Sequence, residues 1–305
     1  MFVFAASDKG GTGRSVTVAN LLYRSALHGN DVCYLDFDFG SPTAGAIFGI
    51  EEVENGTHSG SGLHRYLLKE VGEPERIDVW AATGRHAIRE AGAGAGRLVL
   101  LPGDVGSGDF PQRGDLVEQM LRLFLRLNEE FGLCMVDLSA GRNLAVEMVL
   151  QATSRPEMRN VTSRWLVFHR WTRQHVVAAG GLVNGPCGLL ATAEKAGHDR
   201  AGFAANLRYV RTAVADPAPS AKSGLTARQG AWLDECNKRL NRLAGDHQVG
   251  RSMVLGTVPL DPMLQWQEQL LTDTDVVAGI ANAQTRDAFD SLASRLVDDS
   301  AWETL

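Results

Sequence analysis

The chain has 305 residues, of which 44% are hydrophobic and 22% charged, and a formal net charge of −6 at pH 7. This is the composition of a globular protein long enough to bury a full core. It has no run of 18 apolar residues and no basic leader with a cleavage site, so we expect neither a transmembrane helix nor a signal peptide. Four scattered cysteines without a C-x-x-C pair favour a reducing, cytoplasmic location: Cys33, Cys134, Cys187 and Cys236.

The first predicted element is a short apolar strand, Phe2–Ala6. It leads into a glycine-rich turn at residues 8–13 and then into a helical pattern from Val16 to Leu27. A strand, a glycine turn and a helix N-terminus in this order can hold a phosphate. The glycines let the backbone wrap around the anion, and the N–H groups and the helix dipole point into the turn. A hydroxyl in the first helical turn, here Ser15, can ligate the Mg²⁺ that accompanies a nucleoside triphosphate.

This stretch departs from the ordinary phosphate-binding pattern G-x-x-x-x-G-K-[ST]. Asp8 replaces the first glycine, Lys9 comes early, and Arg14 stands where the lysine is expected. Residues 9–15, KGGTGRS, instead resemble the deviant Walker A motif K-G-G-x-x-K-[ST] of the ParA/MinD ATPases, with Arg14 as the departure. The resemblance implies a nucleotide-binding loop made of Lys9, Gly10, Gly11, Thr12, Gly13, Arg14, Ser15 and Val16.

The second predicted strand, residues 32–35, ends in two acids, Asp36 and Asp38. Carboxylates spaced by two lie on the same side of an extended chain. At the carboxyl end of a parallel strand they face the crevice where ligands bind, and there they suit Mg²⁺ contacts and the positioning of water. Residues 35–40, LDFDFG, resemble switch I of MinD-like proteins. The resemblance implies that Asp36 lies near the metal and that Asp38 helps to activate water.

A third motif, residues 133–141 (LCMVDLSAG), is an apolar strand that ends in Asp137. An acid at this place can hold Mg²⁺ through water. Gly141 leaves the backbone free to rearrange when a γ-phosphate arrives or leaves. The stretch resembles the family's switch II, D-x-P-A-G, with Ser139 in place of proline. The predicted metal-binding residues are therefore Ser15, Asp36 and Asp137.

The rest of the chain has weaker patterns. We expect helices at 116–131, 172–183 and 227–243, and strands at 165–168, within 203–214 and at 252–261. The last strand resembles the family's final core strand, whose exit loop often lies against the nucleotide base, which implies base contacts from Pro259 to Asp261. For the family's base-contacting asparagine, Asn206 is the first candidate and Asn184 the second.

The order of these motifs resembles the ParA/MinD family along most of the chain. The resemblance implies one α/β domain, residues 1–305, with a doubly wound, mostly parallel twisted sheet and helices on both faces, a P-loop NTPase fold. In this family ATP drives a face-to-face dimer, and the early lysine, here Lys9, reaches the phosphates in the partner subunit. The resemblance therefore implies a homodimer formed on ATP, ATP and Mg²⁺ as cofactors, Lys9 and Asp38 as catalytic residues, and an activating protein partner.

The arginine at position 14 leaves open whether the protein hydrolyses ATP. Arginine keeps the charge and offers a planar donor fork to phosphate, but it is longer than lysine, and a small misplacement can cost about a hundredfold in rate. The first hypothesis is a switch with weak Mg²⁺-dependent ATP hydrolysis. The alternative is a non-hydrolysing regulatory or scaffold subunit. An amide-forming enzyme on the same fold is disfavoured by Lys9, and an iron–sulfur reductase component by the scattered cysteines.

Charge is distributed unevenly along the sequence. Residues 151–251 hold 15 Lys and Arg against 7 Asp and Glu, which leaves 15 against 29 of the totals of 30 and 36 elsewhere. The basic section could be a face for non-specific DNA or an acidic partner, or only a solvated surface. Residues 296–305 are acidic, so we expect no direct membrane binding through this segment.

Overall fold

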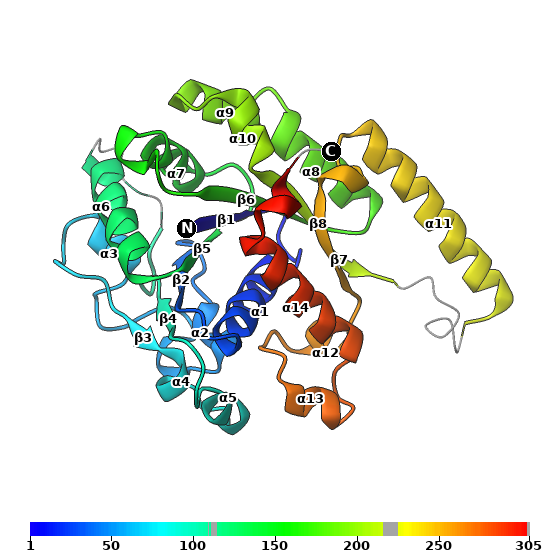
Figure 1. The fold of residues 1–305 in the computed structure, drawn as a ribbon, viewed down its shortest axis with the longest axis horizontal. Coiled ribbons are helices and arrows are strands. Elements are labelled where there is room, and N and C mark those ends of the chain that lie inside the picture. Colours follow the sequence, from blue (N-terminus) through cyan, green and yellow to red (C-terminus); the bar gives the residue numbers. More distant parts are fainter. Residues whose placement is uncertain (109, 111–114, 216–224, 304–305) are drawn as a thin grey trace.

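A computed structural model describes residues 1–108, 110, 115–215 and 225–303. Its elements are arranged around one eight-stranded sheet (Figure 1). The strands are β1 (Phe2–Ala6), β2 (Val32–Phe37), β3 (Ile77–Asp78), β4 (Leu98–Leu101), β5 (Leu133–Leu138), β6 (Ser163–Arg170), β7 (Leu207–Val214) and β8 (Val254–Pro259). Their order is β3-β4-β2-β5-β1-β6-β7-β8, and β3 is antiparallel to β4 whereas the other neighbours are parallel.

Helices cover both faces of this sheet (Figure 1). One face carries α1 (Arg14–Leu27), α2 (Ala44–Phe48), α4 (Val79–Ala82), α5 (His86–Ala91), α12 (Pro262–Trp266), α13 (Asp273–Val277) and α14 (Ala283–Val297). The other face carries α3 (Leu63–Leu67), α6 (Asp115–Glu130), α7 (Leu144–Thr153), α8 (Arg173–Asn184), α9 (Leu189–Ala196), α10 (Arg200–Ala205) and α11 (Ala227–Asp246). Four short 3₁₀ helices complete the fold: η1 (Glu51–Val53), η2 (Pro156–Met158), η3 (Arg251–Met253) and η4 (Asp299–Trp302).

The central strands are apolar on both faces because both faces are covered. In β1, Phe2 and Phe4 pack into the core on one side of the sheet, and Val3 and Ala5 pack into the core on the other. Such continuous apolar runs are typical of parallel strands buried between two helical layers. The doubly wound, mostly parallel fold expected from the sequence is confirmed.

The order of the strands brings the three motifs to one edge of the sheet. β1 lies between β5 and β6, and β2 lies on the far side of β5. The register pairs Asp36 of β2 with Asp137 of β5, and Ala5 of β1 with the same Asp137. Because these strands are parallel, their carboxyl ends meet where the chain order reverses, the place at which doubly wound folds bind ligands.

Most of the predicted elements form where the sequence patterns place them. The helices expected at 116–131, 172–183 and 227–243 are α6, α8 and α11. The strand expected within 203–214 begins only at Leu207, because residues 200–205 form α10. Residues 215–224, which include Pro217 and Pro219 and are predicted from the sequence to form a loop, lie almost wholly outside the described residues.

One stretch of the described chain, Arg173–Ala196, is long and apolar enough to cross a membrane by length and composition alone. In the fold it is interrupted, because α8 ends at Asn184 and α9 begins only at Leu189. Half of the stretch is buried inside the protein, where it packs on β6 and α7. It is therefore accounted for as a pair of core helices.

Candidate functional site

The glycine turn between β1 and α1 has the backbone shape of an anion-binding loop. Gly11 and Gly13 both have positive φ, 68° and 71°, which other residues adopt only at a cost. Gly13 is also the N-cap of α1, so the first N–H groups of that helix lie directly behind the turn. The carbonyl of Thr12 is held from the other side, because the Thr212 hydroxyl donates to it at 2.5 Å.

A cavity of about 690 Å³ opens beside this turn. It brings together segments that are far apart in the sequence: the loop and α1, the ends of β6 and β7, and the exit of β8 with α12. Six of the sequence-predicted site residues line it: Gly11, Thr12, Gly13, Val16, Pro259 and Asp261. Further lining residues that the sequence analysis missed include Arg170, Thr212 and Trp266.

Asp261 lines the cavity but has a structural role. Its two carboxylate oxygens accept hydrogen bonds from the N–H groups of Met263, at 3.0 Å, and Asn282, at 2.9 Å. It is the N-cap of α12 and is almost fully buried. Asp261 therefore shapes the wall of the cavity, and its carboxylate is occupied by protein donors.

Arg14 is not among the residues that line this cavity. Its side chain is 7% exposed and forms a buried ion pair through Nε with Oδ1 of Asp137. Nη1 donates to the Ser7 hydroxyl at 3.1 Å, and Nη2 lies 3.3 Å from Oδ2 of Asp38. The guanidinium that replaces the expected lysine is thus held by the acids of switch I and switch II.

Asp38 is held from two sides. Nη2 of Arg14 donates to its Oδ2, and the hydroxyl of Ser139 donates to its Oδ1 at 2.9 Å. Arg14 and Ser139 are the two positions at which the chain departs from the family motifs. Both departures therefore converge on the carboxylate that the sequence analysis assigns to water activation.

Asp36 lies deeper than the other two acids. Its oxygens accept the N–H groups of Asp38 and Ala44, each at 3.2 Å. Burial, and then the neighbouring charge of Asp137, raise the pKa of Asp36 to about 8. Its carboxyl group is therefore largely protonated at neutral pH, which makes it a poor ligand for a hard cation.

The two carboxylates among the predicted magnesium ligands do not fit the ion as they lie, whereas the third ligand, the Ser15 hydroxyl, accepts only a bond of 3.5 Å from Nη2 of Arg14. Mg²⁺ prefers oxygen ligands in near-octahedral geometry, and a carboxylate binds it in the charged form. Asp137 gives Oδ1 to Arg14, and Oδ2 accepts the Tyr34 hydroxyl at 2.7 Å, while both oxygens of Asp36 accept backbone N–H groups. Within the described part of the chain, no group of three or more His, Cys, Asp or Glu side chains is arranged to hold a metal.

Lys9 and Gly10, by contrast, stand at the exposed edge of the turn. Among the described residues, Lys9 has no hydrogen bond and no ion pair. Its charge acts on His175, whose pKa is lowered by burial and then by the charges of Arg170 and Lys9. The Lys9 ammonium group therefore has no partner within the described chain.

The two base-contacting candidates lie elsewhere. Asn206 immediately precedes β7, at the amino end of the strand, and donates to the Gly202 carbonyl at 3.0 Å. This is the opposite edge of the sheet from the glycine turn, so the assignment of Asn206 to the base is wrong. Asn184 ends α8 and does not line the cavity.

Two of the missed residues carry a sequence signal. Arg170 is a polar residue at the carboxyl end of a central strand, the position that faces the ligand crevice. Trp266 follows the exit loop of β8 by a few residues. Tyr34, which binds Asp137, lies inside an apolar strand pattern and could not be distinguished from a core residue.

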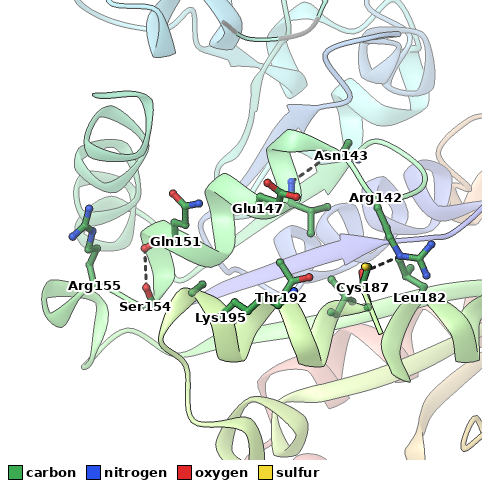
Figure 2. Close-up of a pocket in the computed structure, with 14 residues that line it drawn as sticks. Arg142, Asn143, Glu147, Gln151, Ser154, Arg155, Leu182, Cys187, Thr192 and Lys195 are labelled. Atoms are coloured by element: carbon green, nitrogen blue, oxygen red, sulfur yellow. Dashed lines mark hydrogen bonds between the residues drawn. The ribbon is translucent and has the colours of Figure 1, made fainter. Parts of the chain in front are cut away.

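A second cavity, of about 670 Å³, lies between α7, α8 and α9 (Figure 2). Three cationic side chains and one acid border it: Arg142, Arg155, Lys195 and Glu147. Arg142 donates to the carbonyls of Cys187, at 3.0 Å, and Gly181, at 2.8 Å. Since Arg142 directly follows Gly141, this cavity adjoins switch II.

No family model matches this chain, and no curated protein matches it. Solved structures do. The cell division protein MinD of Aquifex aeolicus is 14% identical over 97% of this chain and 95% of its own, with a TM-score of 0.59. MinD of Pyrococcus horikoshii complexed with Mg-ADP is 14% identical over 100% and 99%, with a TM-score of 0.55. ParA of pNOB8 bound to nonspecific DNA is 16% identical over 96% of each chain, with a TM-score of 0.55.

These similarities define the class of the fold. The chain is a doubly wound α/β protein with the architecture of a P-loop NTPase. Within that class, its fold is that of the MinD and ParA ATPases, as the motifs indicate.

Proposed function

We propose that this chain is an ATP-binding switch protein that dimerises on ATP and acts on a protein partner or on DNA, in positioning, partitioning or regulation. One observation carries the proposal. The turn at the carboxyl end of β1 and the exit loop of β8 line the same cavity, with the N-terminus of α1 at its wall. We propose further that residues 1–305 form one nucleotide-binding domain and that the protein works in the cytoplasm.

The similar structures support the nucleotide and partner parts of this proposal. The Pyrococcus horikoshii protein was solved with Mg-ADP and the pNOB8 protein with nonspecific DNA. An exposed Lys9 at the edge of the turn suits a contact across a dimer interface. The proposal that the chain binds ATP holds with or without a bound Mg²⁺.

The geometry favours the non-hydrolysing alternative over weak ATP hydrolysis. A residue that positions the attacking water needs a free carboxylate oxygen. Each oxygen of Asp38 already accepts one bond, Oδ2 from Arg14 and Oδ1 from Ser139, so the carboxylate is held by the protein and only its second lone pairs remain for a water. We therefore expect the purified protein with Mg²⁺ and ATP to turn over no faster than its Asp38→Ala variant.

The deciding experiment measures mass and nucleotide together. Light scattering after size exclusion is run with ATP, ADP or no nucleotide on the wild type, on Lys9→Ala and on a control, Lys238→Ala, which changes an exposed lysine of α11. We expect an ATP-dependent dimer in the wild type and the control that is lost in Lys9→Ala. The thermal unfolding midpoint of the wild type is measured with and without ATP as well. The proposal is overturned if ATP changes neither the molar mass nor this midpoint.

Fewer basic residues are available to a partner than the sequence suggests. Three arginines of the basic section, Arg164, Arg208 and Arg211, are buried and pack on the rings of Trp302 or Trp171. They stabilise the fold and are not available to DNA. The second cavity, beside switch II, is bordered by three cationic side chains and supports a protein partner with acidic side chains (Figure 2). DNA binding would instead show as an affinity that falls steeply with salt concentration.

The C-terminal segment supports a partner other than a membrane. The apolar face of α14 is buried against α1 and β8, and Trp302 packs on Arg164 and Arg208. This helix therefore has no free apolar face to lay on lipid.

A further inference from the structure

We infer that Arg14 takes the place of Mg²⁺ among the acids of the nucleotide site, so that nucleotide binding does not require a divalent metal. The inference rests on the proposed function, since it concerns the same site. It differs from that proposal in one measurable property, the dependence of affinity on a divalent metal.

The position of the guanidinium is the first step. Arg14 is the first residue of α1 and directly follows Gly13 of the turn. Its side chain is buried, yet it spans the acids of both switches through Nε on Asp137 and Nη2 on Asp38. A fixed positive charge therefore lies among the carboxylates to which a metal ion would otherwise bind.

The second step is the occupancy of those carboxylates. Asp137 bonds Arg14 and Tyr34, Asp38 bonds Arg14 and Ser139, and Asp36 bonds two backbone N–H groups. Breaking a buried ion pair leaves an uncompensated charge and is strongly unfavourable. A divalent ion would have to break the pair between Arg14 and Asp137, and would then lie beside the guanidinium that it displaced.

The third step is the donor capacity of arginine. A guanidinium has five N–H groups in a planar fork that suits phosphate as well as carboxylate. The bonds to Asp137, Ser7, Asp38 and Ser15 use four of them. Arg14 therefore holds the acids and the loop hydroxyls at once, as a metal ion would, and one N–H group of Nη1 remains.

The test is a titration of the full chain with a fluorescent ATP analogue, followed by anisotropy, in excess EDTA and in excess Mg²⁺. We expect the wild-type Kd to differ by less than about threefold between the two conditions. Arg14→Lys shortens the side chain and should release the acids, so its affinity should rise at least about tenfold on addition of Mg²⁺. Arg97→Lys is the matched control, because Arg97 also pairs with an aspartate, Asp31, but lines neither cavity.

The outcomes separate this inference from the proposed function. Wild-type binding that weakens about tenfold or more in EDTA would overturn the role of Arg14 and leave the ATP switch intact. No binding in either condition would overturn the ATP switch itself, and with it this inference. Since the wild-type comparison decides on its own, the test stands even where Arg14→Lys fails to fold.

Discussion

At the scale of single residues, the clearest unused titratable group is His169 near the end of β6. It is 1% exposed, its Nδ1 lies 3.2 Å from the Arg170 carbonyl, and its Nε2 has no hydrogen-bond partner among the described residues. Burial, together with the charges of Arg211 and His175, lowers its pKa to about 4. The folded protein therefore keeps this ring neutral.

This predicts a loss of stability in mild acid. Between about pH 6.5 and pH 4 the unfolded chain binds a proton at His169 that the folded chain does not, so the free energy of unfolding falls as pH falls, by up to about 3 kcal/mol. Chemical denaturation at a series of pH values measures this slope. It should flatten in His169→Phe and persist in His86→Gln, which changes an exposed histidine. An equal slope in His169→Phe would contradict the prediction.

Residue roles were only partly predictable from the sequence. The motifs place Asp36, Asp38 and Asp137 at one edge of the sheet, because parallel strands end together there. They do not determine what each oxygen binds, since Arg14 and Ser139 reach Asp38 through side-chain conformations that no spacing encodes.

At the scale of elements, β8 and α14 approach so closely that one strand position has room only for glycine. A Cβ built on Gly256 would lie 2.5 Å from Cδ2 and 2.8 Å from Cγ of Leu292. Gly181, inside α8, is the opposite case, because a Cβ there would meet nothing within 4 Å.

The two glycines should respond to alanine with opposite signs. Gly256→Ala should destabilise the protein by about 1–3 kcal/mol, because Leu292 must shift or the helix must move. Gly181→Ala should stabilise it by about 0.5–1 kcal/mol, since alanine favours the helix and meets no clash. Urea denaturation of the two variants beside the wild type measures both effects. A higher free energy of unfolding in Gly256→Ala would mean that β8 and α14 are packed less tightly than in the structure.

Long periodic elements were predictable and short ones were not. The helix α6 was expected because Leu116, Met120 and Leu123 recur at helical spacing, and all three are buried on one face. The edge strand β3 has two residues and pairs antiparallel with β4. Such a pairing is set by tertiary contacts at the end of the sheet, and no periodicity can arise in two residues.

At the scale of the whole molecule, the proposed nucleotide cavity exists only because the sheet brings distant segments together. One space is lined by residues 11–13 and 16–17, by residues 212–213 and by several residues between 258 and 268, although more than 190 residues separate the first two segments. Two of these walls, the glycine turn and the exit loop of β8, were predictable from the sequence. The side chains contributed by α12 depend on how that short helix is directed, which is a property of the complete fold.

This arrangement gives nucleotide binding an optical signature. Trp266 lines the cavity and is 83% exposed, whereas Trp232 on α11 is 65% exposed and lines no part of it. A bound nucleotide should cover the Trp266 ring, so ATP should lower quenching of the intrinsic fluorescence by acrylamide. We expect this protection in the wild type and in Trp232→Phe, and its loss in Trp266→Phe. If ATP still protects the fluorescence of Trp266→Phe from quenching, the base lies away from α12. The nucleotide would then occupy only the part of the cavity next to α1.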